Sequence, residues 1–406
     1  MNKKLIVLSL LILFATIWSD WQAIGPDGGN IQALAIDQLN SSVLYAVPYE
    51  YPNNPRVFKT MDAGTNWLQV SSIDDEYVLF LAVDQHQSNI VYGLGRSSYL
   101  HRSTDNGVSW SLIPLPGNGI EIKPDFLTPG KVYTAGSYNL QAALLISTDY
   151  GLTWTPSVPD TFRGTANCCA VDPIDTGTVY LGSAYSRLYR STDSGTNWEL
   201  RNTGFSTDIS IQSLSINPVN SNIILAGTSA GMYRSTNAGE SWSSVGAINS
   251  VFEVEFSQAA SNIGYAIGYA DTTAQFYVST DSGITWTIPT PGIKLDKGAG
   301  FVTDQSEEEV CYAYNTKGIF KTLDFGNHWQ TAHQNIRIAK ISTISVSPSD
   351  NRRIYLEAAE NGVFKSNCAG DTWTRCEDFL SCGSICGIGI APGINSDTLY
   401  ALEGVG

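Results

Sequence analysis

Apolar and polar residues alternate in short runs along the chain, and turn-forming residues separate the runs. Residues 211–242 are representative: the runs IQSLSIN, IILAGT and MYRST are separated by PVNSN and SAG. Alternation with a period of two is typical of strands with one buried face, whereas amphipathic helices repeat every 3.6 residues. Because the helical period is absent, the pattern predicts an all-β protein.

One eight-residue segment, STDSGTNW at 191–198, recurs in seven further copies. Four are close, such as STDNGVSW at 103–110, and three are looser, such as SNCAGDTW from Ser366. A tryptophan closes every copy, and successive tryptophans are 43 or 44 residues apart: Trp67, Trp110, Trp154, Trp198, Trp242, Trp286, Trp329 and Trp373. So regular a period indicates a repeat architecture with one supersecondary unit per copy.

Each repeat has room for four short strands, which is the size of one β-propeller blade. A parallel solenoid is the main competing architecture, but its repeats are usually shorter. The sequence therefore predicts a β-propeller of four-stranded blades about 44 residues long, with eight complete repeats plus a partial ninth. The second strands share tyrosines that we expect to pack between blades: Tyr45, Tyr92, Tyr133, Tyr180, Tyr265, Tyr312, Tyr355 and Tyr400.

The letters of the repeated segment suit a tight turn between the third and fourth strands. In the copy at 191–198, Ser191 and Asp193 can hydrogen-bond the turn backbone, Gly195 can take a positive φ, and Trp198 can cover the turn. Eight equivalent copies favour an architectural role for the aspartates over a catalytic or calcium-binding one.

Two copies depart at the aspartate position. Asn237 keeps an oxygen acceptor there, whereas Cys368 does not. We expect a disulfide from Cys368 to a nearby cysteine such as Cys376 to compensate. More generally, the cluster Cys368, Cys376, Cys382 and Cys386 lacks zinc-site spacing and favours local disulfides, while Cys168 and Cys169 are expected to be buried thiols.

The pattern S-x-D-x-G-x-T-W resembles the Asp-box, or bacterial neuraminidase repeat (BNR), of β-propellers. Similar boxes occur in sialidases, xyloglucan-degrading endoglucanases, sortilin-type receptors and photosystem assembly factors. The resemblance covers nearly all of residues 20–406 and implies the propeller fold, with the box as a marker of the fold and not of one activity.

The two ends of the repeat array are incomplete. Residues 384–406 supply two strands of a ninth unit, and SDWQAIG near the N-terminus resembles a fourth strand without its box. Pairing of such terminal strands would close the ring. Either the closing blade is incomplete or, as we prefer, the chain is a fragment of a longer one. The longer chain could then form a ten-bladed ring or a tandem pair of smaller rings.

The net charge of the chain bears on its binding partners, and its N-terminal segment bears on its cellular location. With 23 Lys and Arg against 38 Asp and Glu, the formal charge is −15, which disfavours nucleic acid and anionic lipid surfaces as partners. MNKK followed by the apolar run 5–17 predicts a signal peptide over residues 1–19, with an uncleaved anchor as the alternative. We therefore expect a protein that is secreted or on the cell surface, or is periplasmic, and whose mature domain is not inserted in a membrane.

Function is expected where the repeats differ. The connections between second and third strands lie on the propeller face opposite the boxes and carry tyrosines that do not recur, which are candidate ligand-binding residues: Tyr49, Tyr51, Tyr99, Tyr138, Tyr185 and Tyr269. Acidic residues expected on the same face are Glu50, Asp74, Asp75, Glu76, Asp160, Asp271 and Asp296. A glycosidase would need two carboxylates facing each other across a cleft.

Enzyme motifs are weak by comparison. The first repeat has no arginine of the sialidase type, and the segment PYEYPNNPRVFKT lacks the aspartate expected by resemblance to xyloglucanases, so no catalytic residue is assigned. No metal or cofactor motif occurs, and none is expected. The sequence favours a non-catalytic propeller that binds a protein, peptide or glycan. The alternative is a xyloglucan endoglucanase-type glycoside hydrolase acting on a β-glucan.

Overall fold

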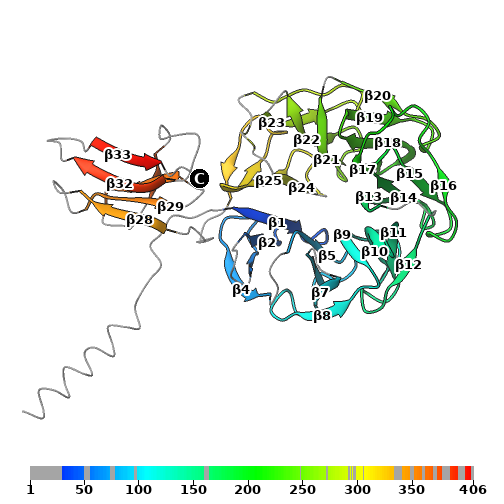
Figure 1. Ribbon diagram of the computed structural model, residues 1–406, viewed down its shortest axis with the longest axis horizontal. Coiled ribbons are helices and arrows are strands. Elements are labelled where there is room, and N and C mark those ends of the chain that lie inside the picture. The colour runs from blue at the N-terminus through cyan, green and yellow to red at the C-terminus, as the bar shows by residue number, and fades with distance from the viewer. Residues whose placement is uncertain are drawn as a thin grey trace, which may run out of the picture. The chain divides into compact units, whose positions relative to one another are not determined.

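A computed structural model describes residues 30–332 and 341–403, with gaps at 50–54, 74–77, 96–97, 160–163, 247, 271–272, 291–292, 294, 296–298, 305, 348–351, 359–361, 369–372, 377–384 and 392–397. Every regular element within these ranges is a β-strand (Figure 1). The chain divides into two compact units, one spanning 28–338 and the other containing residues 339–406. Across the described residues, no helix has the length and apolar character needed to cross a membrane.

The larger unit is a seven-bladed propeller whose blades are antiparallel sheets with their strands in chain order (Figure 1). For six of the seven pairs of adjacent blades, several residues of the two first strands are in contact, so these strands surround the axis of the ring. The first four blades consist of β1 (Ile31–Ile36), β2 (Leu44–Pro48), β3 (Arg56–Thr60), β4 (Leu68–Ser72); β5 (Phe80–Val83), β6 (Val91–Leu94), β7 (Tyr99–Ser103), β8 (Ser111–Pro114); β9 (Asn118–Pro124), β10 (Val132–Tyr138), β11 (Gln141–Ser147), β12 (Thr155–Ser157); and β13 (Ala166–Val171), β14 (Val179–Ser183), β15 (Leu188–Ser191), β16 (Glu199–Leu200).

The remaining three blades follow the same order. In blade six a bridge between Val278 and Thr287 stands in place of a fourth strand. These blades consist of β17 (Ile211–Asn217), β18 (Asn220–Thr228), β19 (Gly231–Ser235), β20 (Ser243–Ser244); β21 (Ser250–Phe256), β22 (Gly264–Ala270), β23 (Thr273–Ser279); and β24 (Gly300–Thr303), β25 (Cys311–Asn315), β26 (Gly318–Thr322), β27 (Gln330–Thr331).

The smaller unit holds the eighth repeat and the beginning of the ninth. The eighth is a complete four-stranded sheet, and the ninth contributes a two-stranded sheet that contacts it. The strands are β28 (Ile341–Val346), β29 (Ile354–Ala358), β30 (Gly362–Ser366), β31 (Thr374–Arg375), β32 (Ile385–Ala391) and β33 (Thr398–Glu403).

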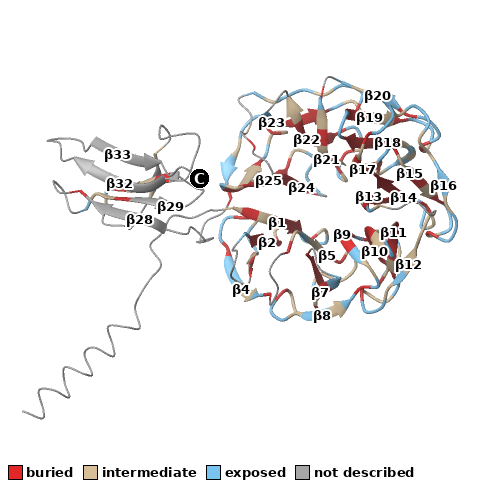
Figure 2. Cartoon of the chain, viewed as in Figure 1, coloured by how far each residue is buried: buried red, intermediate tan, exposed pale blue. Residues whose placement is uncertain are grey.

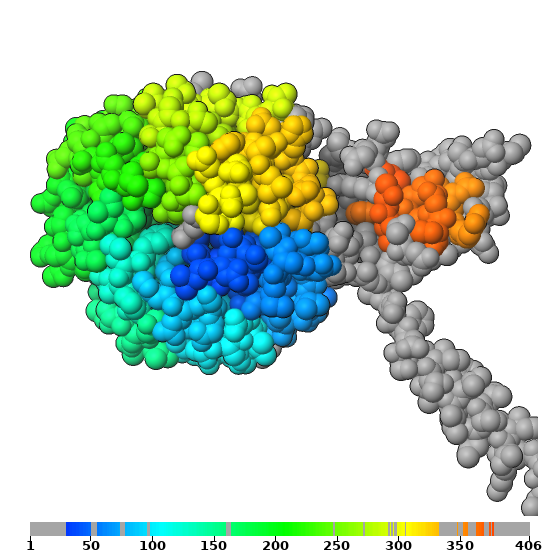
Figure 3. All heavy atoms as spheres, turned by 180° about the vertical axis from the view of Figure 1, so that it is seen from behind, coloured from blue at the N-terminus to red at the C-terminus, as the bar shows by residue number. Residues whose placement is uncertain are grey.

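The predicted ring of eight repeats plus a partial ninth is wrong, because the ring closes after seven blades. The indole nitrogen of Trp67 in blade one donates to the carbonyl of Ala332 in blade seven at 2.7 Å, and Tyr312 of blade seven donates to Ala63 O at 3.2 Å. Leu34 and Ile319 share one buried cluster across this contact. In Figure 3 the blue atoms of blade one abut the yellow atoms of blade seven.

Closure therefore joins two complete blades by their faces, not by pairing of terminal strands. Blades one and seven each contain four strands of their own. The predicted N-terminal closing strand, SDWQAIG, lies outside the described residues. Closure after seven blades excludes one large ring containing all the repeats, which was one of the alternatives left open by the sequence.

The Asp-box forms the turn expected from its letters. Ser191 Oγ donates to Asp193 Oδ1 at 2.8 Å and accepts from Gly195 N at 2.8 Å, while Asp193 Oδ1 also accepts from Asn197 N at 2.7 Å. Gly195 has φ +89°. The hydrogen bonds from Asn197 are the main reason that the pKa of Asp193 is lowered to about 2. The aspartate is thus used in the turn, in agreement with an architectural role.

The variant box with Asn237 also forms, whereas residues 369–372 of the other variant box lie outside the described residues. Asn237 Oδ1 accepts from Ser241 N at 3.0 Å, so the amide oxygen replaces the carboxylate as expected. In the eighth repeat, Cys368 N donates to Ser366 Oγ at 3.2 Å. Cys376 is a free thiol, so the disulfide from Cys368 to Cys376 suggested by the sequence is not formed.

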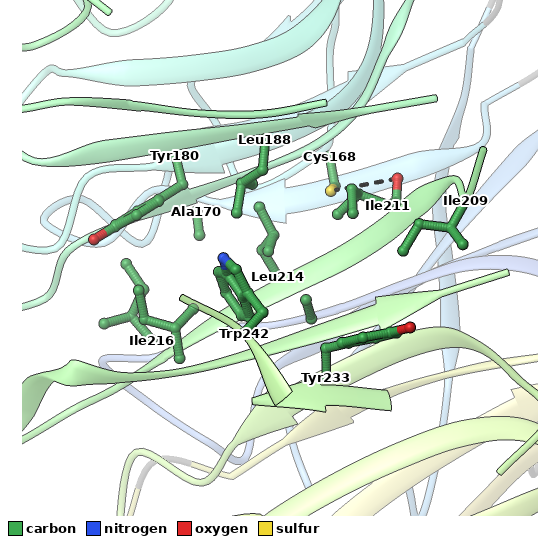
Figure 4. Packing of buried hydrophobic residues seen from close by; sticks show 12 residues of the cluster. Cys168, Ala170, Tyr180, Leu188, Ile209, Ile211, Leu214, Ile216, Tyr233 and Trp242 are labelled. Carbon is green, nitrogen blue, oxygen red and sulfur yellow. Dashed lines mark hydrogen bonds between the residues drawn. The ribbon is translucent and has the colours of Figure 1, made fainter. Parts of the chain in front are cut away.

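Blades four and five are attached to each other through the box of blade five. Tyr180 of blade four is fully buried, and its hydroxyl donates to Ala238 O in the box of blade five at 3.0 Å. In return the box tryptophan Trp242 donates to Arg201 O, just after β16, at 3.0 Å. Figure 4 shows Tyr180 and Trp242 among the buried side chains between these blades, and Figure 2 shows burial following the strands of the ring. The expected burial of the second-strand tyrosines is confirmed in the propeller, with Tyr400 outside the described side chains.

The box glycine is where this contact is tightest. A Cβ on Gly239, which has φ +80°, would lie 3.2 Å from the Tyr180 ring, whereas a Cβ on Gly246, with φ +77°, would meet nothing nearer than 3.7 Å. Both alanine substitutions incur the backbone cost of a positive φ, about 1 kcal/mol. Gly239→Ala should cost at least about 1 kcal/mol more than Gly246→Ala, because the Tyr180 ring must also move. Equal thermal midpoints for the two variants would contradict this, because they would show that the Tyr180 ring accommodates the added methyl group without a loss of stability.

Candidate functional site

The predicted tyrosine face is only partly exposed. Tyr49, Tyr99 and Tyr185 are 37%, 43% and 64% exposed at the connections between second and third strands. Tyr138 instead packs against the buried cluster between blades two and three, and Tyr269 packs edge-on against Phe252 with ring centroids 4.7 Å apart. Tyr51 lies outside the described residues, as do the acids predicted for this face: Glu50, Asp74, Asp75, Glu76, Asp160, Asp271 and Asp296.

Sequence reasoning missed one member of the exposed set. Leu140, in the hairpin between β10 and β11, is 69% exposed and has φ 66°. Tyr49, Leu140 and Tyr185 lie in the connections between second and third strands of blades one, three and four, and Tyr99 begins the third strand of blade two. We call these four residues the apolar arc. In blades five and seven the equivalent hairpins carry Ala230 and Lys317 instead.

Two members of the apolar arc sit in strained turns. Tyr185 and Ser186 have φ 57° each, and Asn139 and Leu140 have φ 49° and 66°. Two-residue hairpin turns of this type favour Asn and Gly, because most side chains clash at positive φ. Tyrosine and leucine therefore cost stability here while leaving their side chains in solvent, a combination that local structure does not require.

A second candidate region is the channel along the ring axis, which the sequence did not reveal. Cavities of about 320 Å³ and 210 Å³ are lined by the first strands of the blades and share several side chains. Strand register aligns these first strands, so that each contributes two equivalent channel positions. The first layer is Ala33, Phe80, Glu121, Cys168, Ser213, Glu253 and Gly300; the second is Ala35, Ala82, Lys123, Ala170, Ser215, Glu255 and Val302.

Charged side chains occupy these layers in only two blades. Blade three supplies Glu121 and Lys123, which form an ion pair at 3.3 Å, and blade six supplies Glu253 and Glu255. Glu121 Oε2 also accepts from Cys169 N at 2.8 Å, and Glu253 Oε2 accepts from Phe301 N at 3.1 Å. Each of these bonds satisfies a main-chain N–H on the inner edge of the next blade.

The channel changes the titration of these groups. Burial, and after it the nearby charge of Glu255, raises the pKa of Glu253 to about 8. Burial also raises the pKa of Glu255, although the charge of Lys123 opposes it. The Glu121 carboxylate holds the pKa of Lys123 above its usual range. The Tyr314 side chain lies near Glu253 because Gly300 has no side chain. A Cβ on Gly300 would clash with the Tyr314 hydroxyl.

Cys168 and Cys169 are buried as predicted. Both are 1% exposed, and burial raises the pKa of each thiol well above its usual value. They are packing residues in the two interfaces of blade four. His328 lies in the box of blade seven, with its Nδ1 2.6 Å from Asp324 Oδ2. Among the described residues no cluster of three metal-ligating side chains occurs.

Glu253 makes stability depend on pH. Between its unfolded pKa of about 4.3 and its folded pKa of about 8, the folded protein binds more protons than the unfolded chain, so the free energy of unfolding falls as pH rises. Glu253→Gln keeps an acceptor for Phe301 N and removes this titration. The variant should melt about 2 °C or more above wild type at pH 8 and close to it at pH 4.5. Glu307→Gln, at an exposed position, is the control and should show no such pH-dependent gain.

Comparisons with known proteins agree with the architecture. Residues 142–274 match the Sortilin-Vps10 family, described as sortilin, neurotensin receptor 3. No curated protein sequence matches the chain significantly. With eight boxes in register and a ring of four-stranded blades, the chain is an Asp-box β-propeller of the BNR type.

Solved propellers resemble it in fold. An ancestral GH74 enzyme superposes with a TM-score of 0.72 at 17% identity over 95% of this chain, which spans 60% of the enzyme's length. The GH74 xyloglucanase from Xanthomonas campestris gives 0.63 at 13% identity, covering 90% of this chain and 70% of the enzyme. YCF48 bound to D1 peptide gives 0.53 at 19% identity, covering 74% of this chain and 94% of that protein.

Proposed function

We propose that the propeller is a non-catalytic binding protein that holds an extended peptide or a segment of a protein on the apolar arc, with a glycan as the other ligand class. The observation that carries this proposal is the placement of Leu140 and Tyr185 at positive φ with 69% and 64% of their surface exposed. Large, exposed side chains held in turns at positive φ are typical of ligand-binding positions. The peptide-bound YCF48 structure, a propeller of similar fold, supports the peptide class.

The arc is suited to a ligand longer than a single residue. Its members come from four consecutive blades, so their side chains are distributed along the rim and are not gathered in one pocket. Tyrosine combines an apolar ring with a hydroxyl that can orient a ligand, which suits both peptide main chain and sugar rings. We further propose that the protein works outside the cytoplasm after removal of residues 1–19, an inference that rests on the N-terminal sequence.

Replacing the strained side chains by asparagine tests the proposal without harming the turns. Asparagine is favoured at positive φ, so the pair Leu140→Asn and Tyr185→Asn should melt at or above the wild-type temperature. On peptide and glycan arrays, the pair should weaken binding of the ligands that wild type selects by about tenfold or more.

The matched control is on the opposite face. Ile174 and Val219 are 51% and 70% exposed in the connections between first and second strands. Ile174→Asn with Val219→Asn removes comparable apolar surface there and should leave array binding unchanged. Equal losses from both pairs would mean that the arc is not the binding surface.

A glycoside hydrolase is the second candidate, and one observation favours it. Burial raises the pKa of Glu253 to about 8, and Glu255 lies beside it on the same strand. Glycosidases also use two carboxyl groups, one as acid and the other as base or nucleophile. Yet Glu253 accepts a main-chain N–H inside the ring channel, where a polysaccharide would have to thread. Release of reducing sugar from xyloglucan that disappears in Glu253→Gln would establish the hydrolase and overturn the binding protein.

A further inference from the structure

The charges in the ring channel are not required by the fold. In blade five, Ser213 and Ser215 occupy the positions of Glu253 and Glu255, and their hydroxyls accept from Val254 N at 3.2 Å and Phe256 N at 2.9 Å. Serine therefore satisfies the inner edge of the next blade as well as glutamate does. The carboxylates of blade six have a cost of burial that the propeller itself does not explain.

Carboxylates outnumber cations along the cavities. Among the described residues, the lining contains Glu121, Glu253 and Glu255 but one lysine, Lys123, whose ion pair is with Glu121. Neither Glu253 nor Glu255 forms an ion pair with any residue that the structure describes. Glu253 and Glu255 are half-buried in the channel, where a carboxylate without an ion-pair partner is unfavourable, so a positive charge entering the channel would be stabilised there.

Unsatisfied hydrogen-bond acceptors lie in the same walls. Gln212 Oε1 and Thr303 Oγ1 are buried without a hydrogen bond, and Thr303 itself is only 1% exposed. Thr303 Oγ1 lies near Glu255 but not in hydrogen-bonding geometry. Both side chains line the cavities, where a ligand that carries N–H donors would satisfy them.

Aromatic rings complete the lining. Phe80 and Phe126 border both cavities, and Phe252 borders the larger one. Ring faces attract ammonium and guanidinium groups and pack against their alkyl stems. The cavities of about 320 Å³ and 210 Å³ have room for a group of side-chain size. The chain's formal charge of −15 also attracts cations towards it.

We propose that the ring channel binds an organic cation, an ammonium or guanidinium group, between Lys123 and the pair Glu253 and Glu255. The cation arrives either as a free amine or as the basic side chain of a bound peptide. This site is separate from the apolar arc and goes beyond the function proposed for it.

Binding is coupled to a proton. Glu253 faces Glu255 on its own strand, Glu121 and Lys123 on β9, Tyr314 on β25, and the main-chain N–H of Phe301 on β24. The incoming cation favours the ionised form of Glu253, so a proton leaves at pH 7. Affinity should therefore be higher at pH 9 than at pH 6.

Calorimetric titration of the full chain with putrescine and with N-acetylargininamide tests the site. Saturable binding with proton release is expected at pH 7, and the double variant E253Q/E255Q should weaken it about tenfold or more. Glu307→Gln carries a loss of charge outside the channel and should bind like wild type. Tighter binding of the arginine derivative would identify a peptide side chain as the source of the cation. Equal or tighter binding of putrescine would identify a free amine as the source.

Lys123→Gln should have the opposite effect. Removal of the Lys123 ammonium group should tighten binding of both probes, because it removes a positive charge that repels them. The proposal fails if neither probe binds wild type at about 10 mM, or if E253Q/E255Q binds as wild type does. The variant L140N/Y185N should bind the cations normally. Loss of array binding with normal cation binding would show that the substitutions affect the apolar arc alone. Normal array binding with loss of cation binding in E253Q/E255Q would show the same for the ring channel.

Discussion

The propeller depends on one repeated contact, in which a ring from the second strand of a blade packs on the Asp-box of the next. The hydroxyl of Tyr180 donates to Ala238 O, and that of Tyr312 donates to Ala63 O, so the contact between blades seven and one repeats the one between blades four and five. Some box tryptophans also donate to the preceding blade, as Trp67 does to Ala332 O. Because blades one and seven present the two halves of this contact, the ring closes without a shared strand.

This contact leaves two regions of the ring free to vary. The box holds blades together near the outer strands, and small or neutral residues such as Ala33 and Ser213 suffice near the axis. The charges of blades three and six and the apolar arc are departures from that background. Both are unfavourable for an isolated propeller, one through buried carboxylates and the other through strained, exposed turns. Interaction with a ligand would offset such costs.

Much of this fold could be predicted from sequence because its determinants are local. The box turn, the strand order and the burial of Tyr45 or Tyr265 follow from residues within one repeat. Blade number could not be predicted, since it depends on the angle between packed sheets. Tyr138 and Tyr269 lie on the predicted face but pack on neighbours such as Phe252, which loop position alone does not indicate. Glu253 stands in an ordinary alternating strand. Only alignment of the repeats distinguishes it, because five of the other six blades have an uncharged residue at its position.

Closure after seven blades can be measured directly by a cross-link. A Cβ at Gly64 of blade one would lie 3.1 Å from the Cβ of Ala332 in blade seven, close to the separation found in disulfides. Oxidation of the double variant G64C/A332C should therefore produce a disulfide between peptides far apart in sequence, identified by mass spectrometry without reductant. In a ring that continued into the eighth repeat, blade one would not adjoin blade seven. Failure of the two introduced thiols to pair, in a folded and oxidised protein, would contradict the seven-bladed ring.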